Sequence, residues 1–327
     1  MKEVYKNIWL TEIPLRGNPL KALNCFIIKS DEGSLIVDTG FCTEENEAIM
    51  MESIKALNLD LGKTSLFLTH LHSDHTGLAG FLAEKGIKIY MSKVDGKLLE
   101  SGIEKDGDFW DRTFEHGMLQ GLSEDNVVLD AHPGLKYQPP EKFSYTPVEP
   151  GEFLKIGDYN FEVIDLIGHT PGIVGLYEKN HKILFCGDHI LGKITPNITF
   201  WGFEYGDMLG KYLDSLDKVY HMDVKHLFSS HRFLVDNHRE RIDEIRNHHD
   251  KRLKEAINVL KKYGSSTVRT VTKNMHWEIS FRNWDDFPNS QKWFAAGEAH
   301  AHLERLRALR KVDYEIKDGL IYYFLSE

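Results

Sequence analysis

Thiols are scarce in this 327-residue chain, and long apolar runs are missing. Its three cysteines, Cys25, Cys42 and Cys186, match neither a zinc ribbon nor a CxxC redox motif, and an odd number gives no disulfide framework. We therefore expect reduced thiols in a cytoplasmic protein. No run of 18 apolar residues predicts a membrane-spanning helix, and the N-terminus MKEVYKNIWL lacks the basic head and apolar stretch of a signal peptide.

Basic residues are in deficit over most of the chain, whose formal net charge is −10. Residues 1–237 hold 23 Lys and Arg against 36 Asp and Glu, whereas residues 238–327 hold 17 against 14. An acidic body repels the phosphate backbone of a nucleic acid at long range. A nucleic-acid partner is therefore disfavoured, although the overall charge does not exclude a local basic groove.

The pattern from residue 25 to residue 92 is typical of an α/β fold. Two apolar runs within residues 25–40 flank a turn signal, which predicts a hairpin. Residues 44–59 have apolar side chains at helical spacing behind Thr43, a candidate N-cap. A strand at 64–70, a helix at 78–86 and a strand at 87–92 follow. This alternation predicts buried strands covered by helices.

Residues 95–150 break this alternation, and we expect them to form an insertion over the active site. A helix is predicted over residues 106–122 and a Pro-rich loop over residues 132–151. The strand pattern then resumes between residues 153 and 191. An amphipathic helix at 206–222 and a last core strand at 224–231 complete the main domain.

We place a domain boundary at residue 237, which gives a main domain of residues 1–237 and a small domain of residues 238–327. A long charged helix follows the boundary and ends at Gly264. A second helix and a closing strand pair come next. Helices followed by a hairpin predict a small, winged-helix-like C-terminal domain.

The run THLHSDHTG at residues 69–77 follows a predicted strand directly and holds four metal-ligand side chains: His70, His72, Asp74 and His75. Open α/β folds place ligands at the carboxyl ends of their strands. Residues 70 and 72 can direct two imidazoles to one point, while residues 74 and 75 turn toward a second. Imidazole and carboxylate ligands without thiolates suit zinc, and one loop that serves both points suits a two-metal site.

Three further apolar strands end in a polar side chain of the same kind: His169, Asp188 and His231. Any one of them could be an ordinary capping or buried polar residue. Their repeated occurrence at strand ends favours a common metal site instead.

These motifs, with Asp38 before them, resemble those of the metallo-β-lactamase superfamily over roughly residues 5–235. The resemblance implies a four-layer αββα sandwich. It also implies two ligand sets joined by one carboxylate: His70, His72 and His169 for a first metal, Asp74, His75 and His231 for a second, and Asp188 between them. Asp38 would orient a loop histidine from outside the ligand set.

The expected cofactor is two zinc ions per chain, with iron or manganese as alternatives. The flavodiiron relatives have Glu where this chain has His72, which disfavours a redox di-iron role. Persulfide dioxygenases with a single iron share the loop sequence, so the loop alone does not identify the metal. Two zinc ions would hold a bridging hydroxide that attacks the substrate. Asp74 or Asp188 would orient this nucleophile and transfer a proton as the catalytic residues.

Aromatic side chains and one amide are candidates for the substrate pocket: Phe109, Phe114, Asn197, Trp201 and Tyr205. Apolar walls favour a small acyl substrate over a bare phosphate. Phe109 and Phe114 could instead dock the insertion helix, and Asn197 could serve a turn after Pro196.

The run GDHILGKITPNI at residues 187–198 and the winged-helix-like tail together resemble a narrower group, the lactamase-β-like and glyoxalase II-like hydrolases. The full ligand set, the aromatic insertion and the acidic body favour hydrolysis of a thioester, lactone or related ester, and the alternative is a metal-dependent endoribonuclease on single-stranded RNA. The tail could cover the active site or contact a second subunit in a homodimer. His248, His249, His300 and His302 lie on its charged helices, where solvated faces are expected. His189 could point into the site or into the core.

Overall fold

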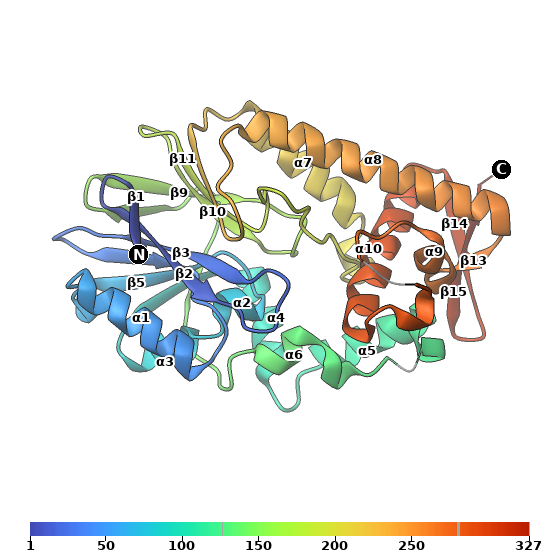
Figure 1. The fold of residues 1–327 in the computed structure, drawn as a ribbon, viewed down its shortest axis with the longest axis horizontal. Coiled ribbons are helices and arrows are strands. Elements are labelled where there is room, and N and C mark those ends of the chain that lie inside the picture. Colours follow the sequence, from blue (N-terminus) through green and yellow to red (C-terminus); the bar gives the residue numbers. More distant parts are fainter. Residues whose placement is uncertain (126, 280–281, 327) are drawn as a thin grey trace.

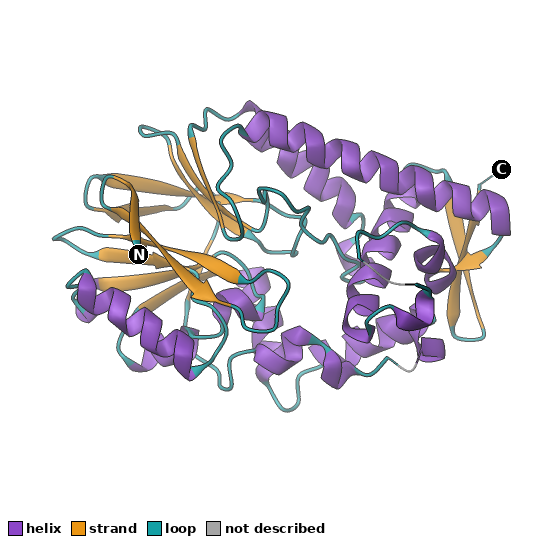
Figure 2. Cartoon of the chain, in the orientation of Figure 1, coloured by secondary structure: helices purple, strands orange, loops and turns teal. Residues whose placement is uncertain are grey.

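The computed structural model describes residues 1–125, 127–279 and 282–326, and its main part is built on two β-sheets (Figures 1 and 2). The first sheet has the order β1 (Lys2–Tyr5), β2 (Ile8–Pro14), β3 (Ala22–Ile28), β4 (Ser34–Val37), β5 (Thr64–Leu68), β6 (Lys88–Ser92), β7 (Thr146–Val148). The second has the order β12 (His226–Ser229), β11 (Ile183–Gly187), β10 (Val174–Glu178), β9 (Tyr159–Asp165), β8 (Phe153–Ile156). Strands β4 to β7 run parallel, as do β11 and β12, whereas the remaining pairs are antiparallel.

The two sheets pack face to face on a shared aromatic core that includes Phe26, Phe161, Phe185 and Phe228. The outer face of the first sheet is covered by α1 (Glu44–Ala56), α3 (Ala79–Glu84) and α4 (Lys93–Ile103). The outer face of the second is covered by α7 (Met208–His221) and the first half of α8 (His238–Tyr263). The predicted four-layer αββα sandwich is therefore confirmed.

Local signals in the sequence explain several element boundaries. Helix α1 begins after Thr43, whose side chain accepts a hydrogen bond from the Asn46 amide, as the N-cap prediction requires. The strands β10 and β11 are buried along their whole length, because the second sheet is covered on both faces. The sequence of β11 is accordingly a continuous apolar run, whereas β10 ends in the buried Glu178, which accepts a hydrogen bond from the His181 amide.

The structure corrects the interpretation of residues 132–151 as a Pro-rich loop. This segment contains the short helix α6 (Pro133–Tyr137) and the strand β7, which pairs with β6 in parallel. A three-residue strand gives no periodic signal, and Pro147 disguises it further. Proline is tolerated here because β7 is the edge strand of its sheet. Helix α5 (Phe109–Gln120) lies where the helix at 106–122 is predicted.

The C-terminal part contains β13 (Ser266–Thr267), α9 (Val268–Asn274), α10 (Asn289–Ala308), β14 (Val312–Lys317) and β15 (Leu320–Leu325), with sheet order β13-β15-β14. Helix α8 runs along both parts of the molecule (Figure 1). Its Ile242 and Ile245 pack in the core of the main part, whereas Val259 and Leu260 pack in the C-terminal core. The domain boundary at residue 237 and the winged-helix assignment stay predictions.

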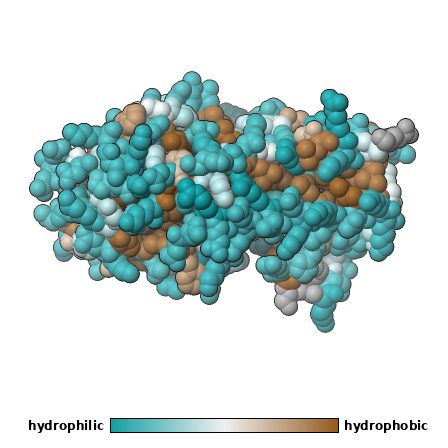
Figure 3. Space-filling model, turned by 90° about the horizontal axis from the view of Figure 1, so that it is seen from above, coloured by the Kyte–Doolittle hydropathy of each residue, from teal (hydrophilic) through white to brown (hydrophobic). Residues whose placement is uncertain are grey.

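Short helical turns complete the described chain: α2 (Ser73–Thr76) and the 3-10 helices η1 (Leu61–Lys63), η2 (Leu122–Asp125), η3 (Leu129–Ala131), η4 (Phe203–Tyr205) and η5 (Trp284–Asp286). The face in Figure 3 is mostly hydrophilic, and its apolar side chains gather in separate patches. Within the residues described, no helix combines the length and apolar character that a membrane span requires.

The expectation of solvated histidines on the C-terminal helices is wrong for His249, His300 and His302, which are buried. Helix α10 contacts α5, α7, α8 and α9 and the strand β14, so it is covered on several sides. Its charged neighbours are partly buried too and pair with one another, as Glu304 does with Arg307. Charged neighbours in the sequence therefore did not indicate exposure. His189 is also buried, against the ring of Tyr212 in the core.

Candidate metal centre

The loop after β5 brings the first two histidines together. His70 Nε2 and His72 Nδ1 lie 3.1 Å apart, and α2 begins directly after His72. Helix α2 then carries Asp74 and His75, and the ring centroid of His75 lies 3.9 Å from that of His70. The loops after β9, β11 and β12 supply His169, Asp188 and His231 at the same edge of the two facing sheets. All seven predicted ligands thus gather at one place.

Their ligand atoms form three overlapping groups, in each of which all atoms lie within 4.8 Å of one another: His70, His72 and His169; His70, His75 and Asp188; Asp74, His75 and His231. The first and third groups are the two ligand sets that the resemblance implies. Asp188 lies between them. Its Oδ2 is 3.7 Å from His169 Nε2, whereas its Oδ1 is 3.5 Å from His75 Nε2 and 3.4 Å from His231 Nε2. The two carboxylate oxygens therefore face different groups.

Several inward-facing atoms of the cluster need a partner that the described residues do not supply. His75 Nε2, His169 Nε2, His231 Nε2 and Asp188 Oδ1 are buried and have no hydrogen-bond partner within the described part of the chain. A buried polar atom without a partner is costly, and such atoms point to a missing ion or water. The residues present therefore fit divalent metal ions.

The opposite nitrogens of these histidines are held by oxygen acceptors. His169 Nδ1 lies 2.8 Å from the Asn197 carbonyl, and His231 Nδ1 lies 2.9 Å from the Ala22 carbonyl. An Nδ1–H that donates to a carbonyl leaves the Nε2 lone pair directed inward. Both histidines are thereby set in the tautomer that binds a metal through Nε2.

Asp38 anchors the loop that carries the candidate ligands, through contacts of both its carboxylate oxygens. Its Oδ1 accepts a hydrogen bond from the Thr69 amide at 2.9 Å, and its Oδ2 accepts from the Thr69 hydroxyl at 2.9 Å. The same Oδ2 lies 2.8 Å from His75 Nδ1. Its position is the one that an orienting residue for a loop histidine needs.

Burial and the neighbouring charges shift the pKa values of several groups in the cluster, and the two effects often have opposite signs. Burial disfavours a charged imidazole, but Asp188 and Asp74 raise the pKa of His231 to about 10. Burial would raise the pKa of Asp74, yet His75 and His231 lower it to about 2. Burial, together with His169, lowers the pKa of His72 to about 3. The carboxylates thus keep protons on histidines that divalent ions would displace.

Asp95 is a site residue that sequence reasoning missed. Its Oδ2 accepts hydrogen bonds from the Leu71 amide at 3.1 Å and the Thr170 hydroxyl at 2.6 Å, and its Oδ1 accepts from the Gly172 amide at 2.7 Å. It therefore joins the two loops that present His70, His72 and His169. Gly172 permits this close approach, because a Cβ there would lie 2.6 Å from Asp95 Oδ1. Asp95 lies at the start of the segment interpreted as an insertion, so no ligand pattern drew attention to it.

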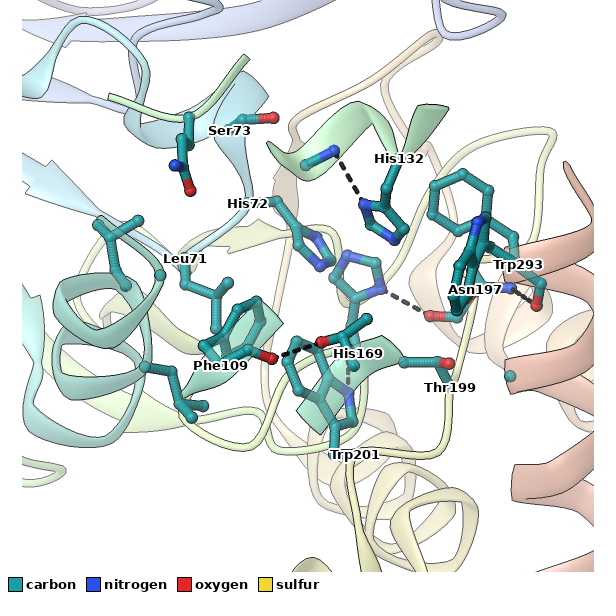
Figure 4. Close-up of a pocket in the computed structure, with 18 of the residues that line it drawn as sticks. Leu71, His72, Ser73, Phe109, His132, His169, Asn197, Thr199, Trp201 and Trp293 are labelled. Carbon is teal, nitrogen blue, oxygen red and sulfur yellow. Dashed lines mark hydrogen bonds between the residues drawn. The ribbon is translucent and has the colours of Figure 1, made fainter. Parts of the chain in front are cut away.

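A cavity of about 680 Å³ opens beside the first ligand group. In Figure 4 the rings of His72 and His169 lie side by side, with Trp201 close to both, and the Trp201 indole N–H donates to the His169 carbonyl. Phe109, Asn197, Trp201 and Tyr205 all line the cavity as predicted pocket residues. Sequence reasoning did not place His132, Trp293 and Phe294 there. Trp293 and Phe294 come from α10 and lie more than ninety residues beyond Trp201 in the chain.

Phe114 does not line this cavity, which corrects its place among the pocket residues. Its side chain is 40% exposed. The cavity-facing side of α5 includes Phe109, Thr113 and His116. Phe114 follows Thr113 and therefore points about 100° away from it around the helix.

The family profile of the metallo-beta-lactamase superfamily matches residues 20–242 of this chain. The protein belongs to the metallo-β-lactamase superfamily. Over 167 residues it is 33% identical to the hydroxyacylglutathione hydrolase GloC of Haemophilus influenzae, which covers 50% of this chain and 65% of that protein. Over 177 residues it is 24% identical to the human acyl-coenzyme A thioesterase MBLAC2, which covers 50% of this chain and 57% of that protein.

Similarity to a solved structure extends over almost the whole chain of this superfamily member. The metallo-β-lactamase family protein TTHA1429 of Thermus thermophilus superimposes with a TM-score of 0.80 at 22% identity, over 98% of both chains. That likeness concerns the fold, and it includes the C-terminal part. Family membership and the two hydrolase-named relatives support the prediction of a metal-dependent hydrolase. The alignments span 65% and 57% of those relatives, so they do not establish the activity or the substrate of this chain.

Proposed function

We propose that this protein is a binuclear zinc-dependent hydrolase of small acyl substrates such as thioesters and lactones. One observation carries the proposal: two ligand groups meet at Asp188 on the wall of a largely apolar cavity. Zinc ions bound there would activate water and polarise a substrate carbonyl. The imidazole and carboxylate donors, without a thiolate among them, suit zinc.

Within this proposal the chain itself holds and transfers the proton. Asp74 and Asp188 both border the cavity, so each carboxylate can reach a substrate. Asp74 Oδ2 lies 3.3 Å from His231 Nε2, so this oxygen faces the second ligand set. The carboxylate can then accept a proton from water and deliver it to the leaving group.

The cavity wall supports an acyl substrate. Phe109, Trp110, Trp201, Trp293 and Phe294 supply aromatic surface, which favours an apolar chain over a bare anion. Burial lowers the pKa of His132 to about 4, so this lining histidine is neutral near pH 7. Lys97 and Arg112 are the Lys and Arg side chains among the described lining residues, and Arg112 pairs with Glu204. The names of the two relatives agree with a thioester substrate.

The proposal is tested by metal analysis followed by turnover assays on a thioester, a lactone, a simple ester and single-stranded RNA. We expect two equivalents of zinc, and thioester or lactone turnover that stops on chelation and returns with zinc. His231→Ala should abolish turnover. His221→Ala is the matched control, because this histidine lies on the exposed side of α7. Acyl turnover that ignores chelation would overturn the proposal.

Single-stranded RNA is the contrasting arm of this panel, because a ribonuclease was the alternative from the sequence. RNA cleavage by this protein should fall steeply as salt is raised, since phosphate contacts dominate such binding. Metal-dependent RNA cleavage with no acyl turnover would replace the acyl proposal by the alternative.

A further inference from the structure

His169 is held from two sides by one short piece of chain, residues 197–201, which we name the bridging segment. The His169 Nδ1–H donates to the Asn197 carbonyl at 2.8 Å. The indole N–H of Trp201 donates to the His169 carbonyl at 3.2 Å. The bridging segment therefore fixes both the ring and the peptide of this candidate ligand.

The bridging segment is in turn attached to α10 of the C-terminal part. Asn197 Nδ2 donates to the Phe294 carbonyl at 3.3 Å and to Glu298 Oε2 at 3.1 Å, and the Phe200 amide donates to the Gly297 carbonyl at 3.0 Å. The ring of Phe200 stacks on that of His300, with centroids 3.7 Å apart. Figure 4 draws the hydrogen bond between His169 and Asn197 and shows Trp293 of α10 on the same side of the pocket as Asn197.

Two residues of α10 are specialised for this attachment. A Cβ on Gly297 would lie 2.0 Å from Thr199 Oγ1, so glycine is what lets the bridging segment approach the helix. Glu298 Oε1 accepts a hydrogen bond from Arg252 Nε at 3.3 Å, and Arg252 is itself buried and lies over the ring of Trp277. The Glu298 side chain is only 14% exposed, and a carboxylate so largely buried needs such a partner to remain in place.

We propose that α10 is a positioning element for the first metal, with Glu298 and Gly297 setting the orientation of His169 through the bridging segment. The inference rests on the proposed metal centre. It gives the C-terminal part a defined role at the active site, beyond covering the cavity. His75 and His231 of the second ligand set are oriented by Asp38 and the Ala22 carbonyl, which lie in the first sheet or directly after it. Loss of the α10 contacts should therefore weaken one metal site selectively.

The test is the zinc affinity of the full-length protein, measured by competition with a chromogenic chelator, together with the visible spectrum of the cobalt-substituted protein. For Glu298→Ala we expect the affinity for one of two equivalents to fall 10- to 100-fold, the range for residues that orient a ligand. The second equivalent should bind as in wild type. Glu298→Gln should restore most of the affinity, since its amide can still bond to Asn197.

Glu304→Gln is the matched control for Glu298→Gln and Glu298→Ala. It removes a second carboxylate from α10, one that is buried and bonds to Arg307 and Tyr323 instead of the bridging segment. We expect wild-type affinity for both equivalents and an unchanged cobalt spectrum. A loss equal to that of Glu298→Ala would overturn the proposal, because it would reflect general damage to the helix.

A steric pair tests the same contact without removing a charge. Gly297→Ala should displace the bridging segment and weaken the same equivalent, whereas Gly297→Ala with Thr199→Ala should recover most of the affinity, because the clashing oxygen is gone. Wild-type affinity in both Glu298→Ala and Gly297→Ala would overturn the inference alone. A wild-type protein that binds no zinc would overturn the proposed function instead.

Discussion

The buried pair of Asp38 and His75, with Asp38 Oδ2 2.8 Å from His75 Nδ1, joins the end of the central strand β4 to the loop of candidate metal ligands. Asp38 has a φ of +62°, a left-handed conformation that non-glycine residues seldom adopt. The surrounding hydrogen bonds hold it there, including one from the Ser230 hydroxyl beside His231. One carboxylate thus ties together loops from both sheets.

Replacing Asp38 with Asn should weaken zinc binding about 10- to 100-fold, the usual cost of disturbing a residue that orients a ligand. Both carboxylate oxygens accept hydrogen bonds, and an amide would present a donor at one of them. Chelator competition measures the affinity. Asp31→Asn, in the exposed hairpin turn, is the matched control and should bind zinc normally. Equal affinities in the two variants would show that Asp38 does not orient the site.

The parts of the site that the sequence predicted are those with a local signal. His70, His169 and His231 follow apolar strands at short distances, and the carboxyl ends of such strands meet at one edge of a sheet. Thr43 gave the start of α1 for a similar reason, since a cap acts within one turn. Strand ends and helix caps depend on a few consecutive residues, so a sequence pattern can indicate them.

The missed parts depend on contacts between distant residues. Asp95 reaches Gly172 across 77 positions, and Asn197 reaches Glu298 across 101. His300 lies among charged residues in the sequence, yet packing of α10 on several elements buries it. Such burial follows from how the C-terminal helices dock, for which periodicity within one helix gives no information.

Gly172→Ala should destabilise the protein by about 1–3 kcal/mol, the usual cost of forcing an atom into a filled space. The new Cβ would lie 2.6 Å from Asp95 Oδ1 and 2.7 Å from its amide nitrogen. Gly80→Ala is the contrasting variant, because a Cβ there has its nearest neighbour at 3.9 Å and the residue lies within α3. That change should stabilise by roughly 0.5–1 kcal/mol. Urea unfolding of the two metal-free variants measures both effects, and effects of the same sign would contradict the steric account.

Phe109→Ala should raise KM for an acyl substrate about 10-fold with a smaller change in kcat, since roughly 1.5 kcal/mol of apolar contact is lost. Phe109 lines the cavity and stands 4.9 Å from the ring of Trp110. Phe114→Ala, on the same helix but outside the cavity, should leave KM within twofold of wild type. Steady-state kinetics on the best thioester of the panel decides, and a KM shift that is larger for Phe114→Ala would mean the substrate binds elsewhere.

Acid should destabilise the C-terminal part through its buried histidines. His249 Nδ1 lies 3.1 Å from His302 Nε2, and the His302 Nδ1–H donates to the Glu298 carbonyl at 2.7 Å, so both rings are bonded in their neutral forms. Burial lowers the pKa of His302 to about 3 and that of His249 well below its ordinary value. The unfolded chain binds protons near pH 6.5 while the folded chain does not. The stability that these histidines contribute is therefore complete above pH 6.5 and is lost progressively as pH falls from 6.5 toward 3.

This sign argument fixes a measurable difference between two variants. Each such histidine should lower the free energy of unfolding by about 1.4 kcal/mol for every pH unit below its unfolded pKa. His302→Gln removes one titrating group. Between pH 6 and pH 5 the variant should therefore take up about one proton fewer on unfolding than wild type, and its free energy of unfolding should fall by about 1.4 kcal/mol less. His221→Gln, on an exposed side chain, should keep the wild-type slope. Urea unfolding in the presence of chelator measures all three slopes, and the metal-site histidines cancel because every protein retains them. A wild-type slope in His302→Gln would mean that this histidine is already protonated in the folded state, and the hydrogen bond from His249 to its Nε2 could not then exist.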